Sequence, residues 1–361
     1  EGEVAPAATP RRGSLLYNRR SFMRTFAAAG LATPLATMRA KAAPVQDKLP
    51  VPAGKIFEGM GGAVSAMYTP YYRTGSKAGR VNEEMIEKLV EYGVKCGLVG
   101  LFVTGSTGES FLLSDEERKQ VFARVAKAAR GRLKLIAHVG HPSSEKAAEY
   151  ARHAASVGFD WTASIGPIYF GQDHEAAGDH YKTISEATDL PFMIYQHGKM
   201  DSEKAARWFD LKNVCGMKYT DRDYYELGNL KRRLGKPAIF YTGYDEQVLN
   251  ALATGEYSGC IGMTDNHIPR HFVKICSLVA QDRLKEAQPV QRDVCRFVQL
   301  MIESANMSLC KSVMRHIGLD CGYSRRPEGR PLSESEYSAF IARVEKLGIV
   351  RKNEALEALG G

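Results

Sequence analysis

The sequence lacks the features that mark several special classes of protein. Its seven cysteines are odd in number and scattered, and no two of them form a Cys-x-x-Cys pair. Neither a disulfide framework nor a zinc cluster is therefore indicated. No apolar run is long enough to cross a bilayer as a helix, so no membrane association is expected. The 361 residues, of which 44% are hydrophobic, are typical of a globular protein with one large core.

Positive charge is concentrated at the start of the chain. The formal net charge is +8, but residues 1–42 hold seven lysines and arginines against two glutamates. These residues contribute +5, which leaves about +3 for the rest of the chain. A body with so little excess charge argues against a nucleic-acid partner.

The first 42 residues resemble a twin-arginine export signal. The pair Arg19-Arg20 precedes a mildly apolar stretch over 26–38, and Ala40-Lys41-Ala42 has the form of a cleavage site. We therefore predict a signal peptide and export to the periplasm. The alternative is a basic N-terminal tail on a cytoplasmic protein.

Short apolar runs and helical stretches alternate after residue 55. Eight runs rich in Val, Ile and Phe are separated by amphipathic segments of helical length. Because parallel strands need such connections and eight strands favour closure, we predict an α/β fold, a (β/α)8 TIM barrel with additional C-terminal helices. The predicted strands are Gly62–Met67, Leu98–Val103, Leu133–Val139, Trp161–Ile165, Phe192–Tyr195, Val214–Met217, Ala238–Tyr241 and Gly259–Ile261. The predicted segments are a signal peptide (1–42), a linker (43–55), the catalytic barrel (56–270) and a C-terminal helical extension (271–361).

Catalytic residues of such barrels lie where strands end, and two reactive side chains are predicted there. Lys218 follows the sixth apolar run directly. Removing an ammonium from water is costly, and a neutral amine in its place can attack a ketone to form an imine. Tyr195 ends the fifth run, where its phenol could move a proton. The alternatives are a lysine that reaches outward to solvent and a tyrosine that only fills the core.

Two polar loops follow other strands. Gly105-Ser106-Thr107-Gly108-Glu109 comes after the second strand, and its glycines and hydroxyls are suited to holding a carboxylate. Gly243-Tyr244-Asp245-Glu246 comes after the seventh, where two acids could accept hydrogen bonds from a polyhydroxylated substrate. The alternatives are a plain connecting turn and a pair of charges at a helix N-terminus.

Together these places resemble the N-acetylneuraminate lyase / dihydrodipicolinate synthase family of class I aldolases. The resemblance covers roughly 57–332, and its hallmarks are G-S-T-G-E, M-I-Y, G-M-K-Y-T and G-C-I-G. It implies that Lys218 forms a Schiff base with a pyruvate-like 2-oxo acid and that Tyr195 donates a proton. It also implies a small-molecule substrate, no cofactor or metal, and a homotetramer. The implied substrate-binding residues are Ser106, Thr107, Tyr169, Thr220, Gly243, Asp245 and Glu246.

Three stretches resemble the sialic-acid lyase branch: Leu133–Gly140, Gly216–Tyr225 and Tyr241–Glu246. This resemblance implies reversible cleavage of N-acetylneuraminate to N-acetylmannosamine and pyruvate. Gln196, Gly198 and Met263 depart from the family pattern, which keeps open another 2-oxo-3-deoxy sugar acid as the substrate of an aldolase or dehydratase. A dihydrodipicolinate-synthase-like enzyme is a further alternative, although Met200 stands where that branch has an arginine.

The sequence leaves two other classes of function open. His138 and His141 lie near one strand end, which could indicate a metal-dependent aldolase, but no carboxylate cluster accompanies them. A sugar-acid binding protein on a former enzyme scaffold is the non-enzymatic alternative.

Overall fold

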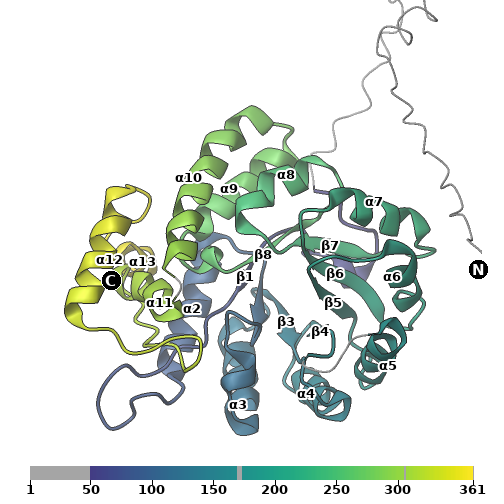
Figure 1. Ribbon diagram of the computed structural model, residues 1–361, viewed down its shortest axis with the longest axis horizontal. Helices are drawn as coiled ribbons and strands as arrows, with labels where there is room; N and C mark the ends of the chain where they lie inside the picture. The colour runs from purple at the N-terminus through teal and green to yellow at the C-terminus, as the bar shows by residue number, and fades with distance from the viewer. Residues whose placement is uncertain (1–48, 169–172, 305, 361) are drawn as a thin grey trace, which may run out of the picture. The chain divides into compact units, whose positions relative to one another are not determined.

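The computed structural model describes residues 49–168, 173–304 and 306–360, and within them the predicted barrel is confirmed. Eight parallel strands pair in chain order, and β8 pairs with β1 to close the ring (Figure 1). The strands are β1 (Gly62–Ala66), β2 (Gly100–Val103), β3 (Lys134–His138), β4 (Trp161–Ile165), β5 (Phe192–His197), β6 (Val214–Thr220), β7 (Ile239–Thr242) and β8 (Gly259–Gly262).

Each strand is followed by a helix that packs on the outside of the barrel. The barrel helices are α2 (Glu83–Cys96), α3 (Asp115–Ala129), α4 (Ser144–Ser156), α5 (His174–Ser185), α6 (Ser202–Trp208), α7 (Tyr224–Arg233), α8 (Val248–Ala253) and α9 (Pro269–Ala280). Short 3-10 turns precede β1 (η1, Lys55–Phe57) and α3 (η2, Ser110–Leu112), and two more follow β7 (η3, Asp245–Gln247) and β8 (η4, Thr264–Asn266).

Local sequence signals explain where the helices begin and end. Ser114 and Glu117 form a capping box at the start of α3, in which each side chain accepts a hydrogen bond from the other residue's backbone N–H. At the start of α2 the Asn82 side chain accepts a hydrogen bond from the N–H of Met85. Gly97 ends that helix with φ +84°, a left-handed conformation that favours glycine.

Strands β5 and β6 are longer than the apolar runs that predicted them. Tyr195 and Lys218 were expected at the strand ends, whereas the strands continue to His197 and Thr220. Gly198 allows the extension, because it has φ +81° and its N–H donates to Thr220 O at 3.0 Å. A residue with a fixed negative φ and no N–H, such as proline, could do neither.

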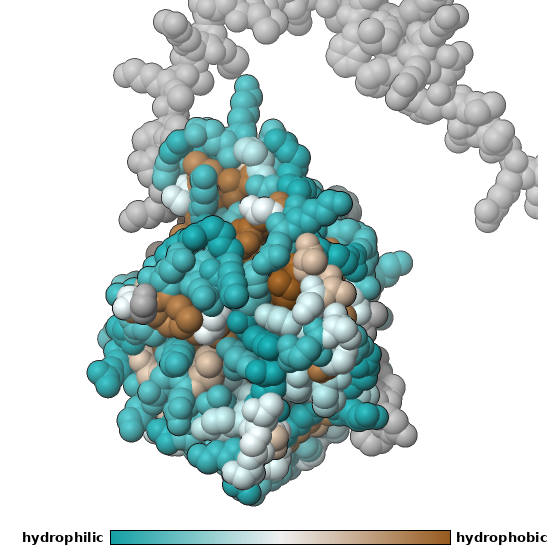
Figure 2. All heavy atoms as spheres, turned by 90° about the vertical axis from the view of Figure 1, so that its left-hand side faces the viewer, coloured by the Kyte–Doolittle hydropathy of each residue, from teal (hydrophilic) through white to brown (hydrophobic). Residues whose placement is uncertain are grey.

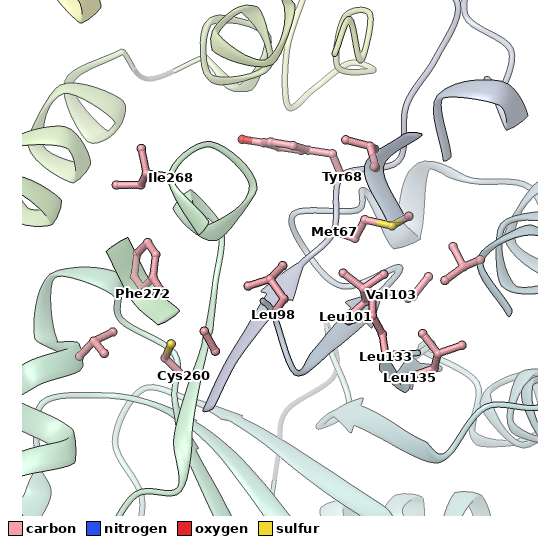
Figure 3. Close-up of a cluster of buried hydrophobic side chains, with 14 of the residues drawn as sticks. Met67, Tyr68, Leu98, Leu101, Val103, Leu133, Leu135, Cys260, Ile268 and Phe272 are labelled. Carbon is pink, nitrogen blue, oxygen red and sulfur yellow. The ribbon is translucent and has the colours of Figure 1, made fainter. Parts of the chain in front are cut away.

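Alternating side chains divide the hydrophobic core into two parts. One part fills the barrel and includes Phe102, Trp161, Met193 and Ile261. The other part lies between the strands and the surrounding helices. Figure 3 shows a portion of this outer core, with side chains from β2 and β8 and from α9.

The C-terminal extension begins later than predicted. The boundary at 270 falls inside α9, which packs against β1 and is the eighth barrel helix. The extension comprises α10 (Leu284–Glu303), α11 (Met307–His316), α12 (Glu334–Lys346) and α13 (Glu354–Leu359). Helix α13 packs beside α2 at one side of the barrel (Figure 1). On the face that Figure 2 shows, hydrophilic residues cover most of the surface and hydrophobic ones appear mainly in hollows between them.

The predicted signal peptide (1–42) lies outside the described residues, as do residues 43–48 of the predicted linker (43–55). Of the linker, Leu49 and Val51 pack against the two parts of the core. Within the described part of the chain, no helix is both long enough and apolar enough to cross a membrane.

Candidate active site

Lys218 and Tyr195 lie side by side on neighbouring strands. They are register partners in the β5–β6 pair, so both side chains point to the inside of the barrel. The Lys218 Nζ lies 4.3 Å from the centre of the Tyr195 ring and 4.9 Å from that of Phe102. Each of the two residues is only 6% exposed. The alternative of a lysine that reaches outward to solvent is therefore wrong.

The Lys218 amine has no polar partner among the described residues. No carboxylate lies within ion-pair distance of it, and no carbonyl or hydroxyl accepts a hydrogen bond from it. Two aromatic faces lie near it, and these attract a cation without occupying the nitrogen lone pair of a neutral amine. The nitrogen is therefore available to a reacting carbonyl carbon.

The Tyr195 ring is surrounded by other rings. The centroids of Phe102 and His138 lie 6.1 Å from it, and that of His197 lies at 6.3 Å. Among the described residues the Tyr195 hydroxyl has no hydrogen-bond partner, which leaves it free to meet a substrate.

His138 is a neutral structural histidine. Its Nδ1–H donates to Thr104 O at 2.9 Å, and its Nε2 accepts from the N–H of Ile165 at 3.3 Å. Burial, helped by the nearby Arg118, lowers the pKa of His138 to about 3. Because both ring nitrogens of His138 are engaged in hydrogen bonds, neither is free to bind a metal together with His141. No group of metal-ligating side chains is found anywhere in the part of the chain that the structure describes.

The loop Gly105–Gly108 lies against the Phe102 ring, which in turn lies next to the Lys218 amine. A Cβ at Gly105 would lie 2.7 Å from the Phe102 ring, so this close approach needs glycine. Ser106 is exposed and Thr107 is half-buried, and neither hydroxyl has a hydrogen-bond partner among the described residues. The loop therefore offers two free hydroxyls at the carboxyl end of β2.

Thr220 and Gly243 lie next to the lysine on the other side. A Cβ at Gly243 would lie 1.8 Å from Thr220 Oγ1 and 3.1 Å from Lys218 Cε, so no larger residue fits there. Thr220 is buried, and its Oγ1 has no partner in the described structure. A buried hydroxyl without a partner in the protein can accept a hydrogen bond from, or donate one to, a ligand or a water molecule.

The two adjacent acids play different structural roles. The Oδ2 of Asp245 accepts hydrogen bonds from the N–H of Thr264 at 2.8 Å and from its hydroxyl at 2.7 Å, whereas Oδ1 has no partner among the described residues. Burial raises the pKa of Asp245, and the charge of Lys218 opposes that shift. Glu246 instead faces the surface and pairs with Arg222 at 3.1 Å.

Sequence reasoning missed the buried acid Asp265. It lies directly after Thr264 in η4, it is fully buried, and its Oδ1 has no partner in the described structure. Burial and then the neighbouring Asp245 raise its pKa well above the usual range. The signal that could have found it is the polar run Thr264-Asp265-Asn266-His267, which follows the last strand directly.

Of the predicted site residues, the structure brings together Lys218, Tyr195, Thr220 and Gly243. Gly105, which directly precedes Ser106 and Thr107, lies against Phe102, and Asp245 lies against Gly262 at the end of β8. Glu246 lies farther out, and Tyr169 lies outside the described residues.

Comparisons with known proteins agree with this arrangement. A family model described as the dihydrodipicolinate synthetase family matches residues 59–347, from just before β1 to just after α12. The N-acetylneuraminate lyase of Rhizobium meliloti (strain 1021) is 32% identical over 283 residues, which are 77% of this chain and 92% of that protein.

Two solved structures are similar over the same part of the chain. The N-acetylneuraminate lyase of Mycoplasma synoviae has a TM-score of 0.74 at 27% identity, and the match covers 81% of this chain and 100% of that one. A structure described as the catalytic lysine mutant of the Ruminococcus gnavus sialic acid aldolase has a TM-score of 0.73 at 27% identity. That match covers 81% of this chain and 99% of the other.

Proposed function

The chain belongs to the dihydrodipicolinate synthetase family and is a lyase of the class I aldolase type, and we propose that it cleaves N-acetylneuraminate reversibly to N-acetylmannosamine and pyruvate. The observation that carries the proposal is the Lys218 amine, enclosed in the barrel and free of polar partners, beside the Tyr195 ring. The catalytic lysine named for the similar Ruminococcus gnavus aldolase supports a lysine in this role.

In the proposed reaction, the Lys218 Nζ adds to the C2 carbonyl carbon of the substrate, and loss of water gives a protonated imine. The C3–C4 bond then breaks, and its electron pair moves toward the imine nitrogen to form an enamine. The proton of the C4 hydroxyl leaves through the Tyr195 hydroxyl. The enamine takes up a proton at C3, and hydrolysis by one water releases pyruvate and restores the amine.

The other predicted residues bind the two ends of the substrate in this proposal. The hydroxyls of Ser106 and Thr107 bind the carboxylate, for which they are free. Thr220 Oγ1, the backbone of Gly243 and the Asp245 carboxylate contact the hydroxyls of the sugar chain. Glu246 and Tyr169 complete these contacts.

A second substrate class is favoured by one observation. Met263 follows β8 and packs against the outer core. A methionine has no hydroxyl, whereas the sialic-acid lyase branch has a serine at this place. This residue favours a different 2-oxo-3-deoxy sugar acid over N-acetylneuraminate. A dihydrodipicolinate-synthase-like reaction is less well supported, because Met200 replaces the arginine of that branch.

We also propose that the enzyme needs no metal or cofactor, because the imine itself accepts the electrons. We further propose a homotetrameric assembly, which the family resemblance suggests, and export to the periplasm, which the twin-arginine-like residues 1–42 suggest.

A substrate panel tests the proposal. Pyruvate release is assayed with N-acetylneuraminate and with shorter 2-oxo-3-deoxy sugar acids, with and without a chelator, and Lys218→Met is the matched control. The proposal expects N-acetylneuraminate to be the fastest substrate, no effect of the chelator, and no release by the variant. If pyruvate were released faster from another sugar acid, that compound would be the substrate instead of N-acetylneuraminate. Loss of activity with the chelator would overturn the imine mechanism.

A further inference from the structure

Both ends of the loop Gly105–Gly108 have an unusual backbone conformation. Thr104 has φ +53° and Glu109 has φ +57°, so two non-glycine residues adopt the left-handed region on either side of the loop. This region is unfavourable for a residue with a side chain, and especially for the β-branched Thr104. Such conformations persist only where the surroundings hold them.

A buried arginine holds the first end. Arg118 of α3 is 1% exposed, and its Nη2 and Nη1 donate to the carbonyl oxygens of His138 and Gly140 at 2.5 and 2.9 Å. Thr104 is tied to the same point, because its hydroxyl donates to His138 O at 2.9 Å and its own carbonyl accepts from His138 Nδ1. No carboxylate in the described structure lies within ion-pair distance of Arg118, which packs over the Tyr150 ring.

A buried lysine holds the second end. The Lys311 Nζ donates to Glu109 Oε1 at 2.5 Å and to Thr69 O at 2.8 Å, and Lys311 is fully buried. The Thr69 hydroxyl in turn donates to Gly108 O at 2.7 Å, within the loop itself. The second carboxylate oxygen of Glu109 accepts from the N–H of Arg325 at 2.8 Å. Lys311 belongs to α11 and Arg325 to the connection that follows it, so these contacts come from the C-terminal extension.

Burying these two charges is costly, and packing alone would not need them. An apolar pair of similar volume often stabilises a fold as well as a buried ion pair does. Arg118 donates to the carbonyls of His138 and Gly140, and the Thr104 hydroxyl is bonded to the same His138 carbonyl. Lys311 donates to Glu109, at the second end of the loop, and to Thr69, whose hydroxyl is bonded to Gly108 O. Between these ends the hydroxyls of Ser106 and Thr107 stay free. The backbone is thus fixed while the binding groups are left available.

We infer that Arg118 and Lys311 are positioning residues that hold the loop Gly105–Gly108 in the shape that binds the carboxylate of the 2-oxo acid. The C-terminal extension is then a working part of the active site. This inference rests on the proposed function, because it assumes that the loop binds the carboxylate of a ketone held by Lys218.

Borohydride trapping with two ketones tests the inference. Pyruvate carries the carboxylate, and methyl pyruvate is the same ketone without the negative charge. For each ketone, the concentration that gives half-maximal labelling of Lys218 is measured in the wild type, in Arg118→Lys and in the double variant Glu109→Gln/Lys311→Met. The double variant removes both partners of the ion pair, so neither is left buried and unpaired. Arg315→Met, which removes a partly exposed cation of the same helix that pairs with Glu334, is the matched control.

We expect the half-maximal concentration of pyruvate to rise about tenfold in both test variants, which corresponds to the loss of about one hydrogen bond to a charged group. The value for methyl pyruvate should change less than twofold, and the Arg315→Met control should match the wild type. A purely structural role would shift both ketones together or neither, and either result overturns the inference. A wild type that is labelled by neither ketone overturns the proposed function, and this inference with it.

Discussion

Lys218 and Lys311 are both buried, yet their surroundings differ. Lys311 is fully enclosed and donates to the Glu109 carboxylate and to Thr69 O. Lys218 is nearly as enclosed, but in the described structure only aromatic faces lie against its amine. Burial alone therefore does not identify a reactive lysine in this chain. The absence of a polar partner at Lys218, next to free hydroxyls, is the feature that supports its proposed role.

The carboxylates near the two lysines differ in the same way. Burial lowers the pKa of Lys311 and the Glu109 carboxylate opposes that shift, so the pair forms a closed unit. Asp245 feels the charge of Lys218 without forming an ion pair with it, and it uses one oxygen for Thr264. The first arrangement stabilises a loop, whereas the second leaves both groups available to a substrate.

The largest expected effect is the loss of turnover on changing Lys218. Lys218→Met and Lys218→Arg should each lower kcat by about 10⁴-fold or more, because neither side chain can form the imine. The midpoint of thermal unfolding should not fall, since no partner of Lys218 is left unpaired. Pyruvate release and circular dichroism measure the two quantities. If Lys218→Arg kept wild-type turnover, Lys218 would not be the reactive amine, and its contrast with the structural Lys311 would have no functional meaning.

Replacing the neighbouring phenol should have the next largest effect. Tyr195→Phe keeps the ring that faces Lys218 but removes the hydroxyl, so kcat for cleavage should fall by about 10²- to 10⁴-fold. Imine formation with pyruvate should persist, because the amine is unchanged. Steady-state cleavage and borohydride labelling of the same preparation separate the two steps. Loss of labelling in parallel with loss of cleavage would show that Tyr195 acts on Lys218 instead of on the C4 hydroxyl.

At Lys311 the expected effect is on stability. Lys311→Met leaves the buried Glu109 carboxylate without its cation and should lower the free energy of unfolding by about 3–5 kcal/mol. Adding Glu109→Gln should restore most of that loss, because the remaining group is then neutral. Urea denaturation of the single and double variants measures both values. If the single variant were as stable as the wild type, the ion pair would not hold this part of the fold.

Asp245 should give a stability difference that depends on pH. Its folded pKa is raised above the unfolded value of about 3.9. The contribution of Asp245 to the free energy of unfolding is therefore largest at low pH and decreases as pH rises through the folded pKa. Asp245→Asn does not titrate, and its stability relative to the wild type should therefore increase with pH. Urea denaturation at several pH values tests the sign, and a relative stability that decreases with pH would contradict it.

The smallest expected effect concerns the sugar end of the substrate. Met263→Ser restores a hydroxyl after β8 and should raise kcat/KM for N-acetylneuraminate by about two- to tenfold, which is the value of one hydrogen bond. The same variant should change little with a shorter sugar acid. A decrease with N-acetylneuraminate would favour the second substrate class.

Much of the fold follows from local sequence patterns. The apolar runs predicted all eight strands, and Ser114 with Glu117 predicted the start of α3. The proximity of Lys218 and Tyr195 follows from their places on neighbouring parallel strands. Local patterns could not predict the extension of β5 to His197, because it depends on the conformation of Gly198 and its bond to Thr220.

Contacts between distant parts of the chain could not be predicted at all. Glu109 and Lys311 are separated by 202 residues, and each alone looks like an ordinary charged residue. The boundary at 270 fell inside α9 because the eighth barrel helix has the same periodicity as the helices that follow it. Only the closed barrel determines which helix packs on β1.

The position of the adduct formed with pyruvate and borohydride tests the central claim most directly. After reduction, peptide mass spectrometry locates the modified lysine in the wild-type enzyme. We predict labelling of the peptide that contains Lys218 and no labelling of the peptide that contains Lys311. An unlabelled Lys218 peptide, or an adduct on another lysine, would contradict the assignment of the reactive amine.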